Sequence, residues 1–163
     1  MSISKPQFTR ILVATDLSEN ADHAFNYATS LADACAARIT VLHVVEKLPP
    51  NAELLLAAYL EYGGVDELRL KSSEELVVEI KARLERFCAE TAEHMAECRF
   101  IFQNVMVEPG KAAERILHHT ATGAFDVLVM GRCGHGRIQE VLLGSTSHRV
   151  LRECRIPVLL IPV

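Results

Sequence analysis

The sequence lacks the features that mark several common classes of protein. No CxxC pair occurs among its five scattered cysteines. An odd number of widely spaced cysteines argues against a zinc site and against a disulfide framework, and it fits a reducing cytosol. We therefore expect a cytoplasmic protein. The cysteines are Cys35, Cys88, Cys98, Cys133 and Cys154.

Signals for membranes and nucleic acids are also missing. No apolar run reaches the roughly 20 residues that span a bilayer. Residues 1–6 contain no hydrophobic signal-peptide core. The formal net charge of −4 disfavours a broad surface for nucleic acid or for an anionic membrane. We expect no nucleic-acid partner and no membrane insertion.

The composition is that of a globular protein. Half of the 163 residues are hydrophobic and 23% are charged, whereas disordered chains combine low hydrophobicity with high charge. A chain of this length can bury a substantial core, so we interpret residues 1–163 as a single domain.

The segment 46–65 is the hardest to interpret. Its apolar patch fits a short helix, a flap over a site or a contact surface.

Five short apolar runs predict strands, and the stretches between them predict helices. Runs such as 11–14 and 127–130 are nearly continuous, which is typical of parallel strands buried on both faces. The alternation predicts right-handed βαβ crossovers and a three-layer α/β/α sandwich. The predicted strands are Arg10–Thr15, Arg38–Val45, Phe100–Val107, Asp126–Met130 and Pro157–Ile161. Helices are predicted after Ser18 as N-cap, from near Asp66, from Lys111 to about Thr120, and from Ser145 to Cys154.

The segment 130–147 carries the most specific signal. Gly131, Gly134 and Gly136 crowd one loop, and Gly144 leads into three hydroxyl residues that open a predicted helix. Glycine uncovers backbone N–H groups and permits positive φ, while a helix N-terminus favours negative charge. Together they predict a phosphate-bearing ligand. The lysine-bearing phosphate loop, GxxxxGK[ST], is absent.

Each residue of this segment also has a simpler interpretation. The glycines could make a tight turn, and the hydroxyls of Ser145 and Ser147 could cap the helix as well as donate to phosphate. Arg132 and His135 could contact phosphate or be solvated. Cys133 could be reactive if neighbouring arginines lower its pKa, or it could be incidental.

Asp16 follows the first predicted strand. In open α/β sheets, ligands bind beyond the carboxyl ends of strands where the strand order reverses. If the first and fourth strands are neighbours there, Asp16 faces the glycine loop, where its carboxylate could accept from ribose or help hold a divalent ion. The alternative is that Asp16 fixes the turn or assists Ser18 in capping.

His43 is interpreted as a hydrogen-bonded core residue, because no nearby nucleophile completes a triad.

These landmarks resemble the universal stress protein family, in its nucleotide-binding branch. The branch motif G-x2-G-x9-G-[ST] is complete as Gly131, Gly134, Gly144 and Ser145. The first strand and its loop, the second strand, and the closing helix and strand also resemble the family. The resemblance covers nearly the whole chain except 46–69, a variable insertion between the second strand and the second helix.

The resemblance implies an open five-stranded parallel sheet of order 3-2-1-4-5, Rossmann-like and adenine nucleotide alpha-hydrolase-like. It implies ATP, or ADP or AMP, at the switch between strands one and four. Mg or Mn could accompany the nucleotide, with Asp16 as the metal contact. Arg132 departs from the small residue often seen after the first glycine, which leaves the nucleotide preference open. The implied contacts are Ala14, Thr15, Asp16, Val44, Met130, Gly131, Arg132, Gly134, Gly144, Ser145, Thr146 and Ser147.

The function implied is that of a nucleotide-binding regulatory protein of the stress response with an unknown protein partner. The chain supplies no evident general base with a transition-state arginine for rapid hydrolysis. A slow ATPase or adenylate-handling enzyme, and an interaction module without nucleotide, are the alternatives. The nearly uncharged segment 156–163 would form an edge strand in this sheet, so we expect a homodimer through it.

Overall fold

The computed structural model describes residues 5–46, 50–95, 98, 101–132 and 143–162. Its strands are β1 (Arg10–Thr15), β2 (Arg38–Val45), β3 (Ile101–Pro109), β4 (Val127–Gly131) and β5 (Val158–Ile161). Its helices are α1 (Glu19–Cys35), α2 (Pro50–Tyr59), α3 (Val65–Arg69), α4 (Ser73–His94), α5 (Ala112–Ala121) and α6 (Ser145–Glu153).

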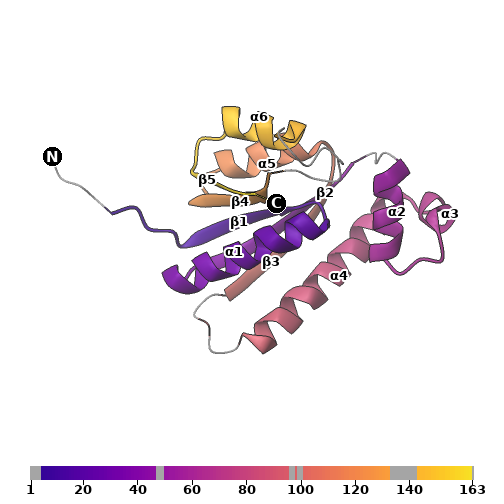
Figure 1. Ribbon diagram of the computed structural model, residues 1–163, viewed down its shortest axis with the longest axis horizontal. Coiled ribbons are helices and arrows are strands. Elements are labelled where there is room, and N and C mark those ends of the chain that lie inside the picture. The colour runs from indigo at the N-terminus through magenta and orange to yellow at the C-terminus, as the bar shows by residue number, and fades with distance from the viewer. Residues whose placement is uncertain (1–4, 47–49, 96–97, 99–100, 133–142, 163) are drawn as a thin grey trace.

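The strands form one parallel sheet in the order β3-β2-β1-β4-β5. The helices α1 and α4 cover one face, and α5 and α6 cover the other (Figure 1). This confirms the predicted three-layer α/β fold and its strand order. The strand β1 lies at the centre, and its apolar residues Ile11, Leu12 and Val13 are fully buried. Burial on both faces explains why the apolar run does not alternate.

The two faces of the sheet bury separate clusters of side chains. In β4, Val127 and Val129 belong to the cluster under α1 and α4. Leu128 and Met130 belong to the cluster under α5 and α6. Successive strand residues point to opposite faces, so one strand contributes to both cores.

A helix begins near Asp66 as predicted, but the prediction of one long helix from that point is wrong. Two helices stand there, α3 and α4, and Ser72 caps the second. The Ser72 hydroxyl accepts from the Glu75 N–H at 3.2 Å, and the Glu75 carboxylate accepts from the Ser72 N–H at 2.7 Å. This capping box fixes where α4 begins. Phe87 in α4 is 40% exposed, although an apolar side chain at helical spacing is usually buried.

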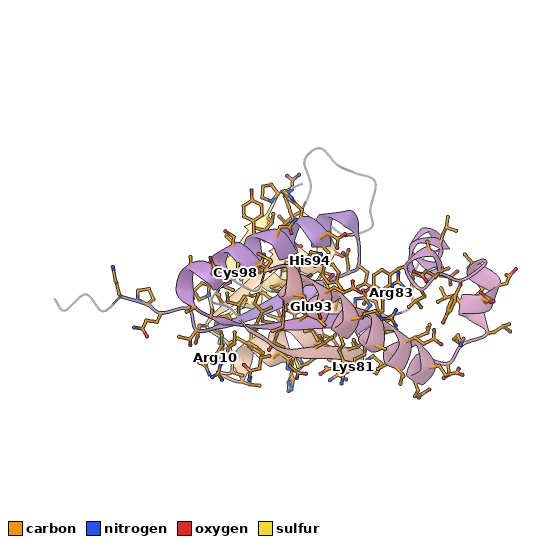
Figure 2. The ribbon with its side chains drawn as sticks, turned by 90° about the horizontal axis from the view of Figure 1, so that it is seen from below. Arg10, Lys81, Arg83, Glu93, His94 and Cys98 are labelled. Atoms are coloured by element: carbon orange, nitrogen blue, oxygen red, sulfur yellow. The ribbon has the colours of Figure 1, made fainter. Side chains whose placement is uncertain are left out.

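The uncertain segment contains a helix, α2, which lies with α3 beside the N-terminal end of α4 (Figure 1). Leu56 and Ala57 of α2 are buried in the cluster under α1 and α4. Arg83 extends from α4 on the side of these short helices (Figure 2). Its guanidinium lies 4.9 Å from the centre of the Tyr59 ring and 2.9 Å from a carboxylate oxygen of Glu61. The segment is therefore held by apolar burial and by a cation–π contact.

The carboxylate of Asp126 accepts several hydrogen bonds at the amino end of the β1–β4 pair. Asp126 Oδ2 accepts from the Thr9 N–H at 2.9 Å, the Thr9 hydroxyl at 2.7 Å and the Arg10 N–H at 2.9 Å. Asp126 Oδ1 accepts from the Arg10 guanidinium at 2.7 Å. Figure 2 shows Arg10 at the end of the sheet away from α2 and α3. The Arg10 guanidinium, together with the Thr9 donors, holds the pKa of Asp126 well below its usual range.

Candidate functional site

The carboxyl ends of β1 and β4 are neighbours, as predicted. Ala14 in β1 pairs with Met130 in β4. From β1 the chain passes to β2 on one side, whereas β3 leads across the sheet to β4 on the other side. This is the point at which strand order reverses, where α/β sheets bind ligands. The structure brings Ala14, Thr15, Met130 and Gly131 together at this edge.

The loop after β1 is held by its own polar side chains. Asp16 Oδ1 accepts from the Ser18 N–H at 3.2 Å and from the Ser18 hydroxyl at 2.6 Å. The Ser18 oxygen accepts from the Ala21 N–H at 3.3 Å and caps α1. Asp16 therefore assists the cap, as the alternative interpretation predicts. A second role at ribose or metal stays a prediction.

Leu17, between these two residues, has a left-handed backbone with φ of 64°. Bulky side chains rarely adopt this conformation. The Leu17 N–H donates to the Thr15 hydroxyl at 3.1 Å, and its side chain packs against the core under α1. Sequence reasoning missed this strained residue, because nothing about leucine signals positive φ.

His43 holds the last residue of β1. Its ring Nδ1 lies 2.9 Å from the Thr15 carbonyl oxygen, and the residue is 7% exposed. A carbonyl only accepts, so Nδ1 carries the hydrogen. The prediction of a hydrogen-bonded core histidine is confirmed. Val44, the next residue, lies in β2 on the side of β1 opposite β4, and it is also buried.

Three hydrogen bonds fix the start of α6 at the end of β4. The Gly144 N–H donates to the Arg132 carbonyl at 3.2 Å, and the Arg132 N–H donates to the Ile161 carbonyl at 2.9 Å. The Ser147 hydroxyl donates to the Gly131 carbonyl at 3.1 Å, and Ser147 is 3% exposed. The serine side chains do not cap α6, because the N-cap is Gly144 itself. Its φ of −59° is open to any residue, so positive φ does not explain this glycine.

Unpaired donors gather at this point. A helix leaves its first N–H groups without partners inside the helix. Within the described part of the chain, the N–H groups of Ser145, Thr146 and Ser147 have no acceptor. The buried Nε of Arg132 also lacks a partner among the described residues. The first turn of α6 contains no acidic residue. Such an arrangement favours an anion.

Parts of the predicted site are not tested by this geometry. Gly134, Gly136, Cys133 and His135 lie outside the described residues. Among the residues that the structure describes, no group of three or more His, Cys, Asp or Glu side chains could hold a metal ion. In the same part of the chain, no helix has the length and apolar character needed to cross a membrane.

Sequence comparison places the chain among known proteins. The model described as the Universal stress protein family matches residues 7–162. The chain is 33% identical over 154 residues to a Thermus aquaticus universal stress protein from the QAH/OAS sulfhydrylase 3′ region, covering 94% of this chain and 98% of that one. It is 30% identical over 155 residues to the universal stress protein YxiE of Bacillus subtilis, covering 94% and 99%.

Solved structures with the same fold include the universal stress protein UspA from Lactobacillus plantarum. It superposes with a TM-score of 0.69 at 22% identity, covering 96% of this chain and 99% of that one. A universal stress protein in complex with cAMP gives 0.57 at 16% identity, covering 94% and 97%. One from Archaeoglobus fulgidus in complex with dAMP gives 0.60 at 16%, covering 94% and 98%. On the family match and the sequence relatives, this chain belongs to the universal stress protein family.

Proposed function

We propose that this chain binds an adenine nucleotide at the carboxyl ends of β1 and β4 and acts as a regulatory protein of the stress response. One observation carries the proposal. Unpaired N–H groups at the start of α6 and the buried Nε of Arg132 gather where the strand order reverses. The family members described with cAMP and dAMP support the adenine nucleotide class.

The phosphates would bind to backbone rather than to hydroxyl groups. Ser147 already donates its hydroxyl to Gly131, so only its N–H is available to a ligand. Thr146 is half-buried and Ser145 is exposed at the first helical position. The base and ribose would lie toward β1 and the end of β4. The proposed contacts there are Ala14, Thr15, Asp16, Val44, Met130 and Gly131. At the phosphates they are Arg132, Gly144, Ser145, Thr146 and Ser147, together with Gly134, which lies outside the described residues.

A divalent ion would be held chiefly by the nucleotide. The described residues contain no cluster of protein ligands, and Asp16 Oδ1 is engaged by Ser18. Mg²⁺ is commonly bound by one or two carboxylates together with substrate phosphates. Mg²⁺ or Mn²⁺ would therefore arrive with ATP or ADP, with Asp16 as its protein contact.

Calorimetric titration with ATP, ADP and AMP tests the proposal. The protein is first stripped of any small molecule that co-purifies, and mass spectrometry identifies that molecule. We expect saturable binding of at least one adenine nucleotide to the folded protein. Failure of all three to bind would favour an interaction module without nucleotide.

The chain is further proposed to act as one domain and to form a homodimer through β5. The family match spans residues 7–162, and α2 and α3 lie between β2 and α4. The strand β5 stands at the edge of the sheet, where an unpaired ladder can pair with a second copy. Leu159 is 37% exposed on this strand. Ile161 is only 3% exposed and packs in the core, so it cannot serve as a probe of the contact.

We predict that Leu159→Lys weakens the dimer. A charge beside the edge strand would have to lose water in the paired state, which costs several kcal/mol unless it is matched. Light scattering across a dilution series should show twice the monomer mass for the wild type and a shift toward monomer for the variant. Leu70→Lys, at an 85% exposed leucine on another face, is the control and should leave the mass unchanged. A monomeric wild type at high concentration would remove the dimer from the proposal.

A further inference from the structure

We propose that Arg132 sets the charge class of the ligand. The site would select a phosphomonoester dianion, such as the phosphate of AMP, over a phosphodiester monoanion, such as that of cAMP. This inference rests on the proposed nucleotide site and adds its specificity.

Arg132 is held at the phosphate end of that site by its backbone. Its N–H donates to Ile161 of β5, and its carbonyl accepts from Gly144 at the start of α6. Arg132 follows Gly131, the last residue of β4. Its two backbone hydrogen bonds therefore place it between the end of β5 and the start of α6, next to the open N–H groups of the first turn.

The carboxylates on the elements packed around this point are engaged elsewhere. Glu114 and Glu153 pair with Arg149 at 3.4 and 3.6 Å. Glu108 at the end of β3 lies 2.9 Å from His119 of α5. Asp16 accepts from Ser18. Among the described residues, no carboxylate contacts the buried Nε of Arg132.

The charges at the site decide between the two kinds of phosphate. A guanidinium contributes one positive charge, and a helix N-terminus acts as about half a charge. A phosphomonoester carries about −1.5 to −2 at pH 7 and offers three acceptor oxygens. A cyclic phosphodiester carries a single charge and offers two unesterified oxygens. The monoester therefore balances the positive charge of the site. It also accepts hydrogen bonds from more of the unpaired donors there.

The test compares AMP and cAMP on the wild-type chain and on Arg132→Gln. A hydrogen bond to a charged group contributes about tenfold to hundredfold in affinity. We expect Arg132→Gln to lose AMP binding by about this factor and cAMP binding by only a few-fold. The ratio of the affinity for AMP to the affinity for cAMP should therefore fall sharply. Arg132→Lys should restore part of the ratio, because it returns the charge without the Nε donor.

Two controls separate charge from other effects. The methyl ester of AMP carries one charge but keeps the open 3′ hydroxyl, so it should behave like cAMP. Arg152→Gln removes an exposed arginine of α6 that pairs with Glu153, and it should leave both affinities unchanged. Thermal melting of each variant checks that the fold is intact.

The outcomes distinguish this inference from the proposed function. Equal losses for AMP and cAMP in Arg132→Gln, or no loss for either, would overturn the selection by Arg132. A wild type that binds cAMP at least as tightly as AMP would overturn it as well. A wild type that binds no adenine nucleotide would overturn the proposed function itself.

Discussion

The two ends of the β1–β4 pair are built in opposite ways. At the amino end, Asp126 accepts hydrogen bonds from Thr9 and Arg10, and an ion pair of 2.7 Å closes the edge. At the carboxyl end, α6 presents N–H groups without acceptors, and Arg132 keeps an unpaired buried nitrogen among the described residues. At the amino end the polar groups are hydrogen-bonded to one another. At the carboxyl end donors remain available to a ligand.

This difference separates stability from function along the same two strands. A buried donor without a partner, such as Arg132 Nε, costs about 1–3 kcal/mol, and folding alone gives no reason to keep it beside the open N–H groups of a helix start. Functional sites commonly retain such groups because a ligand satisfies them. Changes at the amino end should alter unfolding without altering binding, and changes at the carboxyl end should do the reverse.

The largest expected effect is at the amino end. Asp126→Ala removes the acceptor of two backbone N–H groups and of two side-chain donors. We expect the free energy of unfolding to fall by about 2–4 kcal/mol. Denaturant titration measures this, and calorimetry should show unchanged nucleotide affinity. A large loss of affinity in the folded variant would contradict the separation of the two ends.

The same carboxylate predicts a pH dependence. Its folded pKa is depressed by Arg10 and Thr9, so its contribution to stability is present above the unfolded value of 3.8. That contribution is lost as the pH falls below this value and toward the lower folded pKa. The difference in unfolding free energy between the wild type and Asp126→Ala should therefore be constant near neutrality and narrow below about pH 4. A difference that does not narrow in acid would show that the charge of Asp126 contributes little.

A smaller effect is expected at the carboxyl end from Ser145→Pro. Gly144 has φ of −59° and ψ of 151°, a conformation that a following proline accepts, and the first helical position tolerates proline. The variant thus removes one N–H donor while keeping α6. We expect about tenfold weaker nucleotide binding and little change in stability. Ser145→Ala, which removes only the hydroxyl, is the matched control and should bind nearly as the wild type does.

The buried strands were the most predictable part of the molecule. Continuous apolar runs set the bounds of β1 and β2 as predicted, because both faces of these strands are covered. The end of β3 was less well predicted, since Glu108 and Pro109 extend the strand beyond the apolar run. The break between α3 and α4 was not predicted, although Ser72 and Glu75 have the residue types and the spacing of a capping box. The apolar stripe continues across that break, and periodicity alone does not show it.

The candidate site was predictable in location but not in detail. Strand order and the motif around Gly144 predicted which edge carries it. The bond from Ser147 to Gly131 and the engagement of Asp16 by Ser18 depend on distances of a few ångströms that no local pattern encodes. Ile161 looked like part of an exposed edge, yet it packs into the core beneath α1 because strand alternation turns it inward.

The backbone of Arg132 has a consequence for communication within the protein. This residue bonds to Ile161 of β5 through its N–H and to Gly144 of α6 through its carbonyl. The proposed ligand site and the proposed dimer edge therefore meet at one peptide segment. If occupancy of the site moves that segment, pairing of two copies must change as well, and pairing must change affinity by the same factor. Nucleotide titrations at different protein concentrations would then give different apparent affinities.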